Sequence, residues 1–347
     1  MTREETSEIT SREAIVLGTI VREYVASARA VGSRWVARQS GLDLSPASIR
    51  NCMMDLEDKG LLTHRHTSGG RFPTHLGYRR YVDAVMKRAQ LGRRQQRSVD
   101  EALAPRFSSL ERLFEAVCVT LGQHSDQLSV VLSPRYDSSV VDRVELNQVD
   151  ERRVLVVFRM TSGIERTIVR AVEGTVGSDD LRESLLFVNS NGRGRTLAAL
   201  AGLLEQEEMK PRLRGLALAR AVFGAARELA ESETAEHFHL WGTSNILAQP
   251  EFEDRDRLRE MFRALEERKV LAELFEPTRH RRNVCITIGE ENPVEALRDC
   301  SVVAGSYRFG EFGGSVGVIG PTRMPYEQVV ALVDYVAAAV GTILQRN

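Results

Sequence analysis

The chain contains 347 residues, of which 42% are hydrophobic and 27% are charged, and its formal net charge is −1. This length predicts two or three domains with substantial cores, and the composition is that of a soluble protein. No apolar run approaches the length of a membrane span and the N-terminus lacks the pattern of a signal sequence, which argues against membrane contact and favours a cytoplasmic protein. The cysteines lie in apolar stretches without a CxxC spacing, so we expect buried, reduced thiols at Cys52, Cys118, Cys285 and Cys300.

The charge is distributed unevenly along the chain. Residues 12–97 contain 16 Lys and Arg against 7 Asp and Glu, a balance of +9, whereas residues 98–347 carry a net charge of −8. A basic N-terminal part on an acidic remainder indicates a polyanionic partner for the N-terminal part alone. The sequence therefore favours a nucleic-acid-binding module at the front of the chain.

Two short helices are predicted first. Thr10 and Glu13 have the spacing of a capping box, and the apolar face that follows predicts a helix to about Ala28. After a short break, a second helix is expected from Ser33 to about Ser40. Tight connections between short helices are typical of a helix-turn-helix unit.

A third helix is predicted within residues 42–62. Ser45 suits the N-cap, Pro46 suits the first helical position, and Gly60 suits the C-terminal stop. One apolar stripe at helical spacing consists of Ile49, Cys52, Met53 and Leu56. This stripe is expected to face the core, so the opposite side of the helix is available for recognition.

The opposite side of this helix carries small and hydrogen-bonding side chains, namely Ala47, Ser48, Arg50 and Asn51. Asn can pair with adenine and Arg with guanine, while Ala or Ser leaves room for a thymine methyl group. Taken alone, such a helix is more often an ordinary amphipathic helix with a polar outer face. The basic charge of the N-terminal part favours the interpretation as a DNA-reading helix.

A hairpin is predicted directly after this helix, because a Ser-Gly-Gly turn within residues 61–74 separates two short extended runs. Its tip is rich in Arg, His, Thr and Ser, which is the layout of a winged helix whose wing contacts the DNA backbone or minor groove. A metal site at His64, His66 and His75 is an alternative, but no Cys or carboxylate completes the ligand set. Phosphate contact or solvation of the wing is favoured.

The remaining chain predicts an α+β body. A basic helix is expected at 75–90, and the polar residues 91–104 are predicted to be a linker. A helix near Phe107–His124 is followed by strands at Leu128–Leu132, Val140–Gln148, Arg153–Thr161 and Glu165–Ala171. Helical patterns at 195–206, 213–230 and 254–269 precede strands at Val284–Ile288 and Val302–Tyr307 and a last helix at Tyr326–Leu344. Strands, helices and strands again predict a sheet domain interrupted by a helical insertion.

Several stretches of the body could suggest enzyme chemistry, and each has a simpler interpretation. The glycines within 310–320 lack the lysine of a phosphate-binding loop and predict a tight turn between two core strands. Glu290 and Glu291 lie at a strand end without a positioned partner. Partly buried histidines and an ordinary serine are the better interpretation of His237, His239 and Ser244, which lack a ligand set and a hydrolase motif. We therefore expect no metal, no cofactor and no enzymatic activity.

Six blocks of the sequence resemble, in order, the HrcA family of bacterial heat-inducible transcription repressors. They are AVGSRWVA (30–37), LSPASIRNCMMDLEDKGLL (44–62), HTSGGRFPTHLGYRRYVD (66–83), WGTSNILAQPEFED (241–254), IGEEN (288–292) and GSVGVIGPTRMPYEQVV (314–330). The resemblance covers nearly the whole chain. Any one block alone is weak, but together they are specific.

The resemblance implies a multidomain α+β protein with an N-terminal winged helix-turn-helix, a GAF-like domain and a helix-rich dimerisation domain inserted into it. The implied ranges are 1–90 for the winged helix, 91–104 for the linker, 105–177 and 276–347 for the GAF-like domain, and 178–275 for the insert. It also implies a cytoplasmic homodimer that binds an inverted-repeat operator of the CIRCE type ahead of chaperone operons, with the chaperonin GroEL as co-repressor.

The candidate DNA-binding residues lie in the second helix, the third helix and the wing. Ser48, Arg50 and Asn51 are predicted to contact base edges, and Arg34, Arg65 and Arg71 are predicted to contact phosphates. The other candidates are Ser33, Ser45, Ala47, His66, Thr67, Ser68 and Gly70. The alternative function is a transcription regulator whose GAF-like body senses a small ligand.

Overall fold

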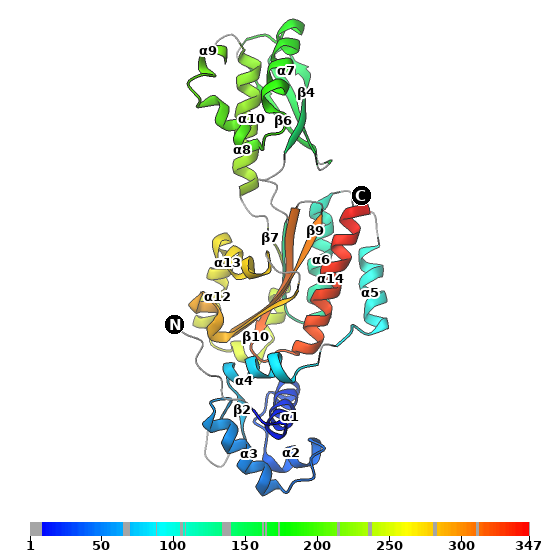
Figure 1. Ribbon diagram of the computed structural model, residues 1–347, viewed down its shortest axis with the longest axis vertical. Coiled ribbons are helices and arrows are strands. Elements are labelled where there is room, and N and C mark those ends of the chain that lie inside the picture. The colour runs from blue at the N-terminus through cyan, green and yellow to red at the C-terminus, as the bar shows by residue number, and fades with distance from the viewer. Residues whose placement is uncertain are drawn as a thin grey trace. The chain divides into compact units, whose positions relative to one another are not determined.

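Figure 1 shows the computed structural model of the chain, which divides into two compact units. Unit 1 consists of Met1–Leu132, Phe238–Tyr307 and Gly314–Asn347, and unit 2 consists of Ser133–His237 and Arg308–Gly313. The structure describes residues 9–64, 70–87, 89–104, 107, 109–133, 140–161, 163, 165–172, 174–213, 216–234, 238–279, 283–309 and 312–346. The protein is a mixed α+β chain with an N-terminal helical region and antiparallel sheets.

The N-terminal region of unit 1 begins with the three predicted helices, α1 (Ser11–Ser27), α2 (Ser33–Gln39) and α3 (Pro46–Asp58). The predicted capping box at the start of α1 is present, because Thr10 and Glu13 exchange both of its hydrogen bonds. Each helix buries one apolar face against its neighbours, so the three form a common core.

A two-stranded antiparallel sheet follows, in which β1 (Leu62–Thr63) pairs with β2 (Phe72–Pro73). The chain then forms α4 (His75–Arg80) and continues as a π-helix, η1 (Tyr81–Val85). The predicted hairpin and the predicted helix after it are therefore confirmed.

Residues 91–104, which were predicted to be a linker, contain the helix α5 (Arg93–Leu103). This prediction is wrong because Val99 and Leu103, one helical turn apart, are both buried. They lie on the side of α5 that packs against α6 (Leu110–Ser125) and α14 (Tyr326–Arg346). A polar, Arg-rich stretch with two well-placed apolar residues thus gains its helix from tertiary packing.

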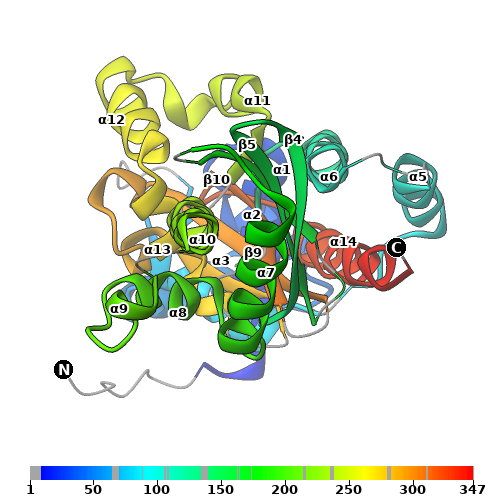
Figure 2. The same ribbon diagram turned by 90° about the horizontal axis from the view of Figure 1, so that it is seen from above.

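A five-stranded sheet forms the centre of unit 1, in the order β7-β3-β10-β9-β8. The pairs β10 with β3, β3 with β7, and β8 with β9 are antiparallel. Figure 2 shows α6 and α14 on one side of this sheet and α12 and α13 on the other. The bounds of the strands are β3 Leu128–Leu132, β7 Phe238–Trp241, β8 Cys285–Ile288, β9 Cys300–Phe309 and β10 Phe312–Pro321. The bounds of the helices and 3-10 turns after β7 are α11 Thr243–Leu247, η3 Pro250–Phe252, α12 Arg255–Glu266, α13 Arg268–Arg279, η4 Gly289–Glu291 and η5 Glu295–Leu297.

The glycines within 310–320 were predicted to form a tight turn between two core strands. The strands β9 and β10 flank residues 310 and 311, which lie outside the described residues, and the later glycines belong to the central strand β10. Its glycines allow close contact with neighbouring groups: a Cβ atom on Gly317 would lie 2.5 Å from the carbonyl oxygen of Val303, and one on Gly314 would lie 2.5 Å from that of Leu132. Glycine at these two positions of β10 reflects close backbone approach.

Unit 2 contains a second antiparallel sheet of three strands, β4 (Val141–Asp150), β5 (Arg153–Met160) and β6 (Glu165–Ala171). One face of this sheet packs on helices and shares their apolar core. The helical elements of unit 2 are α7 Ser178–Gly192, α8 Leu197–Ala201, η2 Gly202–Leu204, α9 Lys210–Leu213 and α10 Ala217–Thr234.

The expected insert, 178–275, differs from the compact unit at both ends. Strands β4 to β6 were assigned to the GAF-like domain, but in the described part of the chain they form a sheet of their own and pack on α7 and α10 of unit 2. Residues 238–275 were assigned to the insert, but β7 pairs with β3 and α11 to α13 pack on the five-stranded sheet of unit 1. The interrupting unit is therefore an α/β layer pair rather than a helical bundle.

Helix α14 departs from the expectation that no apolar run is long enough for a membrane span. Its segment Tyr326–Gln345 is long and apolar enough to cross a membrane by length and composition. Within unit 1, however, residues at helical spacing on α14 are fully buried, including Val329, Val333, Val336 and Val340. These residues form one side of the core, so the apolar character of α14 is explained by packing against the sheet.

The cysteine prediction is correct for three of the four thiols. Cys52, Cys118 and Cys300 are buried, whereas Cys285 on β8 is partly exposed. Burial raises the pKa of Cys52 to about 11 and the pKa values of Cys118 and Cys300 to about 12. These three thiols therefore stay protonated and behave as small apolar core groups.

Candidate nucleic-acid interface

Helix α3 begins as the sequence predicts. The Ser45 side chain accepts a hydrogen bond from the backbone N–H of Ser48 at 3.1 Å, and Pro46 occupies the first turn. The side-chain oxygens of Ser45 and Ser48 also lie 3.0 Å apart. The predicted stripe is confirmed, because the buried residues of α3 are Ile49, Cys52, Met53 and Leu56. This anchoring fixes which side of α3 faces outward.

The outward side of α3 carries the predicted reading residues. Ala47, Arg50 and Asn51 are exposed and Ser48 is half-buried. Within the described part of the chain, neither Arg50 nor Asn51 has a hydrogen-bond or ion-pair partner for its side chain. Met54 continues this side one turn further, with 49% of its surface exposed, and was not among the candidates. An apolar side chain so exposed on a helix is the signal that could have identified it.

Helix α2 contributes the next two candidates. Ser33 is its first residue and is half-buried, and Arg34 is exposed and unpaired among the described residues. α2 packs directly against α3. A long cationic side chain beside the N-terminal end of an exposed helix is suited to phosphate contact.

The base of the wing is tied to the segment between α1 and α2. The backbone of Arg71 exchanges two hydrogen bonds with that of Val31, at 2.8 and 2.9 Å. Gly70 lies so close to this segment that a Cβ atom there would be 2.7 Å from backbone atoms of Val31. Gly70 therefore allows close packing of the base of the wing against this segment.

The structure changes the role expected of Arg71. Its side chain is only 15% exposed, and its Nε donates to Oε2 of Glu57 at 2.7 Å. The other carboxylate oxygen of Glu57 contacts Nδ1 of His64 at the end of β1. Glu57, which was not among the candidates, thus joins the last turn of α3 to both strands of the wing. Arg71 is engaged inside the protein and is not a free phosphate ligand.

Four candidates, Arg65, His66, Thr67 and Ser68, were predicted at the tip of the wing and lie outside the described residues. The metal alternative has no support in the part of the chain that is described, where no group of three or more His, Cys, Asp or Glu side chains could hold an ion. His64 is paired with Glu57, and Nδ1 of His75 lies 4.0 Å from Glu290.

An ion pair joins α1 to the end of α3. Lys59 Nζ donates to both carboxylate oxygens of Glu13, at 2.7 and 2.9 Å. Burial raises the pKa of Glu13, but the hydrogen bonds from Lys59 and Thr10 outweigh this effect, so its pKa is lowered from its usual value. The carboxylate therefore stays ionised and holds the two helices together.

The described residues of the stretches that suggested enzyme chemistry lie in structural contacts or on the surface. Glu291 accepts hydrogen bonds from Arg79 and from the backbone N–H of Ile288. The ring of His239 lies tilted against the ring of Phe114, with centroids 5.7 Å apart. Ser244 is exposed on α11, and His237 lies outside the described residues.

Comparison with known proteins identifies similar proteins that match nearly the whole chain. The family model described as "HrcA protein C terminal domain" matches residues 111–330. The chain is 34% identical to the heat-inducible transcription repressor HrcA of Chlorobium phaeobacteroides, over 98% of this chain and 99% of the relative. It is 36% identical to the repressor of the same name from Natranaerobius thermophilus, over 97% of each.

A solved structure shares the fold. It is described as "Crystal structure of a hypothetical protein at 2.2 A resolution", with a TM-score of 0.62 and 22% identity over 98% of this chain and 99% of that chain. The family model covers more than half of the chain, and the relatives, which are repressors rather than enzymes, are matched from end to end. The chain therefore belongs to the HrcA family of heat-inducible transcription repressors.

Proposed function

We propose that this protein is a cytoplasmic, sequence-specific DNA-binding repressor of heat-shock chaperone operons. The observation that carries the proposal is the outward side of α3, where Arg50 and Asn51 are exposed without partners while the opposite side of the same helix is buried. A folded, basic helical region that presents unsatisfied hydrogen-bonding side chains is suited to reading base edges in the major groove.

In this proposal the N-terminal region is a winged helix. Ala47, Ser48, Arg50 and Asn51 face the base edges, and Met54 adds apolar contact with a thymine methyl group. Ser33, Arg34 and Ser45 lie where phosphates would run, at the exposed starts of α2 and α3. The wing tip, with Arg65, His66, Thr67 and Ser68, contacts the backbone or the minor groove beside it.

The operator is an inverted repeat of the CIRCE type, read by a homodimer, because a two-fold protein matches a two-fold site. In this proposal the five-stranded sheet with its helices is a GAF-like domain, and unit 2 supplies the dimer contact. The support comes from the face of the unit 2 sheet that its helices leave open. This face has apolar side chains at its centre: 49% of Val169 is exposed, Leu155 beside it is half-buried, and Val157 is covered by its neighbours.

Charged side chains of both signs lie beside these apolar residues. Arg159 pairs with both Glu145 and Glu165 across the three strands. Because the patch contains both charges, two copies can meet face to face without like charges being forced together. A second copy of the chain is therefore a suitable occupant of this face.

Heat inactivation and the chaperonin GroEL complete the proposal. Heating opens the least stable parts of the body first and exposes apolar surface, which a chaperonin recognises. After a heat pulse, we expect purified protein to recover operator binding in the presence of GroEL and to recover it poorly without GroEL. Full recovery without chaperonin would contradict this part of the proposal.

The test of DNA binding uses the full-length protein and a duplex that carries the inverted repeat upstream of a chaperone operon from the same genome. A scrambled duplex of equal composition is the control. We expect the specific complex to form at least about a thousandfold more tightly than the scrambled one at moderate salt. Equal affinity for both duplexes would rule out sequence-specific repression.

A further inference from the structure

Several of the sequence blocks that resemble the HrcA family lie outside the proposed DNA-reading residues, and they meet at one junction inside unit 1. We call this junction the seam: it consists of the contacts between residues 11–85 and the parts of unit 1 around residues 249–251, 286–291 and 323–327. The N-terminal side contributes α1, α4 and η1. Blocks 66–83, 288–292 and 314–330 each supply at least one polar contact across it, and Glu251 of block 241–254 holds Arg323 from the body side.

Arg79 on α4 makes the most extensive contact across the seam. Its Nε donates to Oε1 of Glu291 at 2.7 Å and its Nη2 donates to Oε2 of the same carboxylate at 2.6 Å. Nη2 also donates to the backbone oxygen of Ile286 on β8, at 2.6 Å. Nη1 is held by Asp83 at 3.2 Å. A bidentate pair of this kind fixes direction as well as distance.

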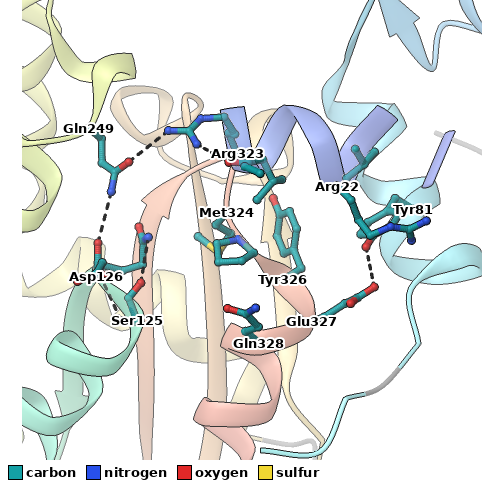
Figure 3. A pocket seen from close by; sticks show the side chains of 15 residues that line it. Arg22, Tyr81, Ser125, Asp126, Gln249, Arg323, Met324, Tyr326, Glu327 and Gln328 are labelled. Atoms are coloured by element: carbon teal, nitrogen blue, oxygen red, sulfur yellow. Dashed lines mark hydrogen bonds between the residues drawn. The ribbon is translucent and has the colours of Figure 1, made fainter. Parts of the chain in front are cut away.

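Arg323 makes the second contact, seen in Figure 3. Its Nη1 donates to the backbone oxygen of Val25 at 2.7 Å, in the last turn of α1. Its Nε pairs with Glu251 at 2.5 Å, and its side chain is only 12% exposed. A cation at the C-terminal end of a helix satisfies a free carbonyl and complements the helix dipole. Arg323 therefore holds the end of α1 from the body side.

Two tyrosines add smaller contacts. The hydroxyl of Tyr81 donates to Oε1 of Glu327 at 2.7 Å, as Figure 3 shows, and the rings of Tyr78 and Tyr326 lie 5.9 Å apart. Two open pockets lie beside these contacts. One open hollow of about 490 Å³ is lined by Tyr81 and Arg323, and another of about 510 Å³ is lined by Arg79.

The seam therefore differs from the core of the sheet. Protein interiors are close-packed, and spaces larger than a water molecule are few. Here, directional polar contacts and one buried pair of tyrosine rings border open spaces, so the junction depends on a small number of contacts. Partly exposed ion pairs contribute little free energy each, so such a junction opens more easily than the core.

We propose that Arg79 and Arg323 are positioning residues that lock the DNA-reading helices to the body, so that operator binding requires an intact seam. This inference rests on the proposed function. Both half-sites of an inverted repeat are occupied together only if the two reading helices of a dimer are held at a fixed separation and angle. When the seam opens, each reading helix keeps its affinity for one half-site, but the joint binding of two half-sites is lost.

The test measures spacing selectivity, which a merely destabilised protein would not lose. The probes are the inverted-repeat duplex, the same duplex with its spacer lengthened by a base pair or two, and a single half-site. We expect the parent protein to prefer the natural spacing strongly. In Arg79→Ala and in Arg323→Ala, affinity for the natural spacing should fall at least about tenfold and the preference over the lengthened spacers should disappear, with half-site affinity unchanged.

The matched control is Arg257→Ala, which removes an ion pair of 2.9 Å with Asp299 that lies within the body and does not reach the seam. It should keep the parent's spacing preference. If Arg79→Ala fails to fold or dimerise, Glu291→Gln removes the same ion pair with a side chain of equal size, and Glu251→Gln does the same for Arg323→Ala.

Two results would overturn the inference: seam variants that retain the parent's spacing preference, or a parent protein that has none. Failure of the parent to bind the operator at all would instead show that the proposed function is wrong.

Discussion

Asn51 is the residue on which base recognition most depends in the proposed function. Its amide is exposed on the outward side of α3 and has no partner among the described residues, so its hydrogen bonds are available to a base. Replacement by Ala should cost about 1–3 kcal/mol on the operator and relax sequence choice at one position per half-site. Competition binding with operator and scrambled duplexes measures this, and an equal loss on both would refute the assignment.

Arg71 and Arg34 differ in a way that binding measurements can resolve. Arg71 is paired with Glu57, whereas Arg34 is unpaired and exposed. Replacing Arg34 by Ala should reduce the slope of log affinity against log salt by about one, because one phosphate contact is lost. Arg71→Ala should weaken binding by displacing the wing and leave the slope close to that of the parent.

Glu57→Gln provides the matching measurement for Arg71. Because Glu57 and Arg71 act through one contact, the double variant should lose no more affinity than the more affected single variant. A reduced salt slope for Arg71→Ala alone, with Glu57→Gln unchanged, would show that Arg71 contacts phosphate after all.

At the scale of the element, the helices of the N-terminal region could be predicted closely from the sequence. Cap residues and a single apolar stripe define α3, and both signals are local. The same local signals revealed the outward residues of α3. They could not reveal that Arg71 is paired with Glu57, because that contact joins residues 14 positions apart in sequence.

The elements that were predicted wrongly depend on contacts made far away in the sequence. Helix α5 is stabilised by burial of Val99 and Leu103, and its Asp100 accepts a hydrogen bond from Tyr335, 235 residues later. The boundary of the insert was also predicted wrongly. The sequence pattern of β4 to β6 predicts strands, but it does not predict which sheet these strands join. The partner of a strand is decided by side-chain packing, and the periodicity of its sequence does not identify that partner.

Glu13 gives an element-scale prediction with a pH signature. Its pKa is lowered in the folded protein, so the stability that it contributes is present above its unfolded pKa and is lost as the pH falls through its folded pKa. Glu13→Gln should reduce the free energy of unfolding at neutral pH by about 1–3 kcal/mol, because Lys59 loses its partner, and should weaken the acid dependence. Urea unfolding at several pH values measures both effects.

The matched control for Glu13 lies on the same helix. Glu23 has no ion pair among the described residues, and Glu23→Gln should leave the unfolding free energy nearly unchanged. An equal effect of the two substitutions would show that the tie between Glu13 and Lys59 contributes nothing specific.

At the scale of the whole molecule, reading an inverted repeat requires two copies joined by something other than the reading helices. The open face of the unit 2 sheet is the surface we assign to this task. It combines exposed Val149 and Val169 with the ion pairs around Arg159. Leu186 on α7 is also exposed, to 67%, but it lies on the helical side of the unit and serves as a matched control.

Val169→Asp should convert the dimer to a monomer, because a carboxylate buried at the centre of the contact would lose its hydration without gaining a partner. Leu186→Asp should leave the dimer intact. Sedimentation velocity at several concentrations distinguishes the two variants, and binding to the inverted repeat should fall together with dimerisation. The monomer should still bind a single half-site as the parent does, since α3 is untouched. A dimer that survives Val169→Asp and dissociates with Leu186→Asp would place the contact on the helical side of unit 2 and refute the sheet assignment.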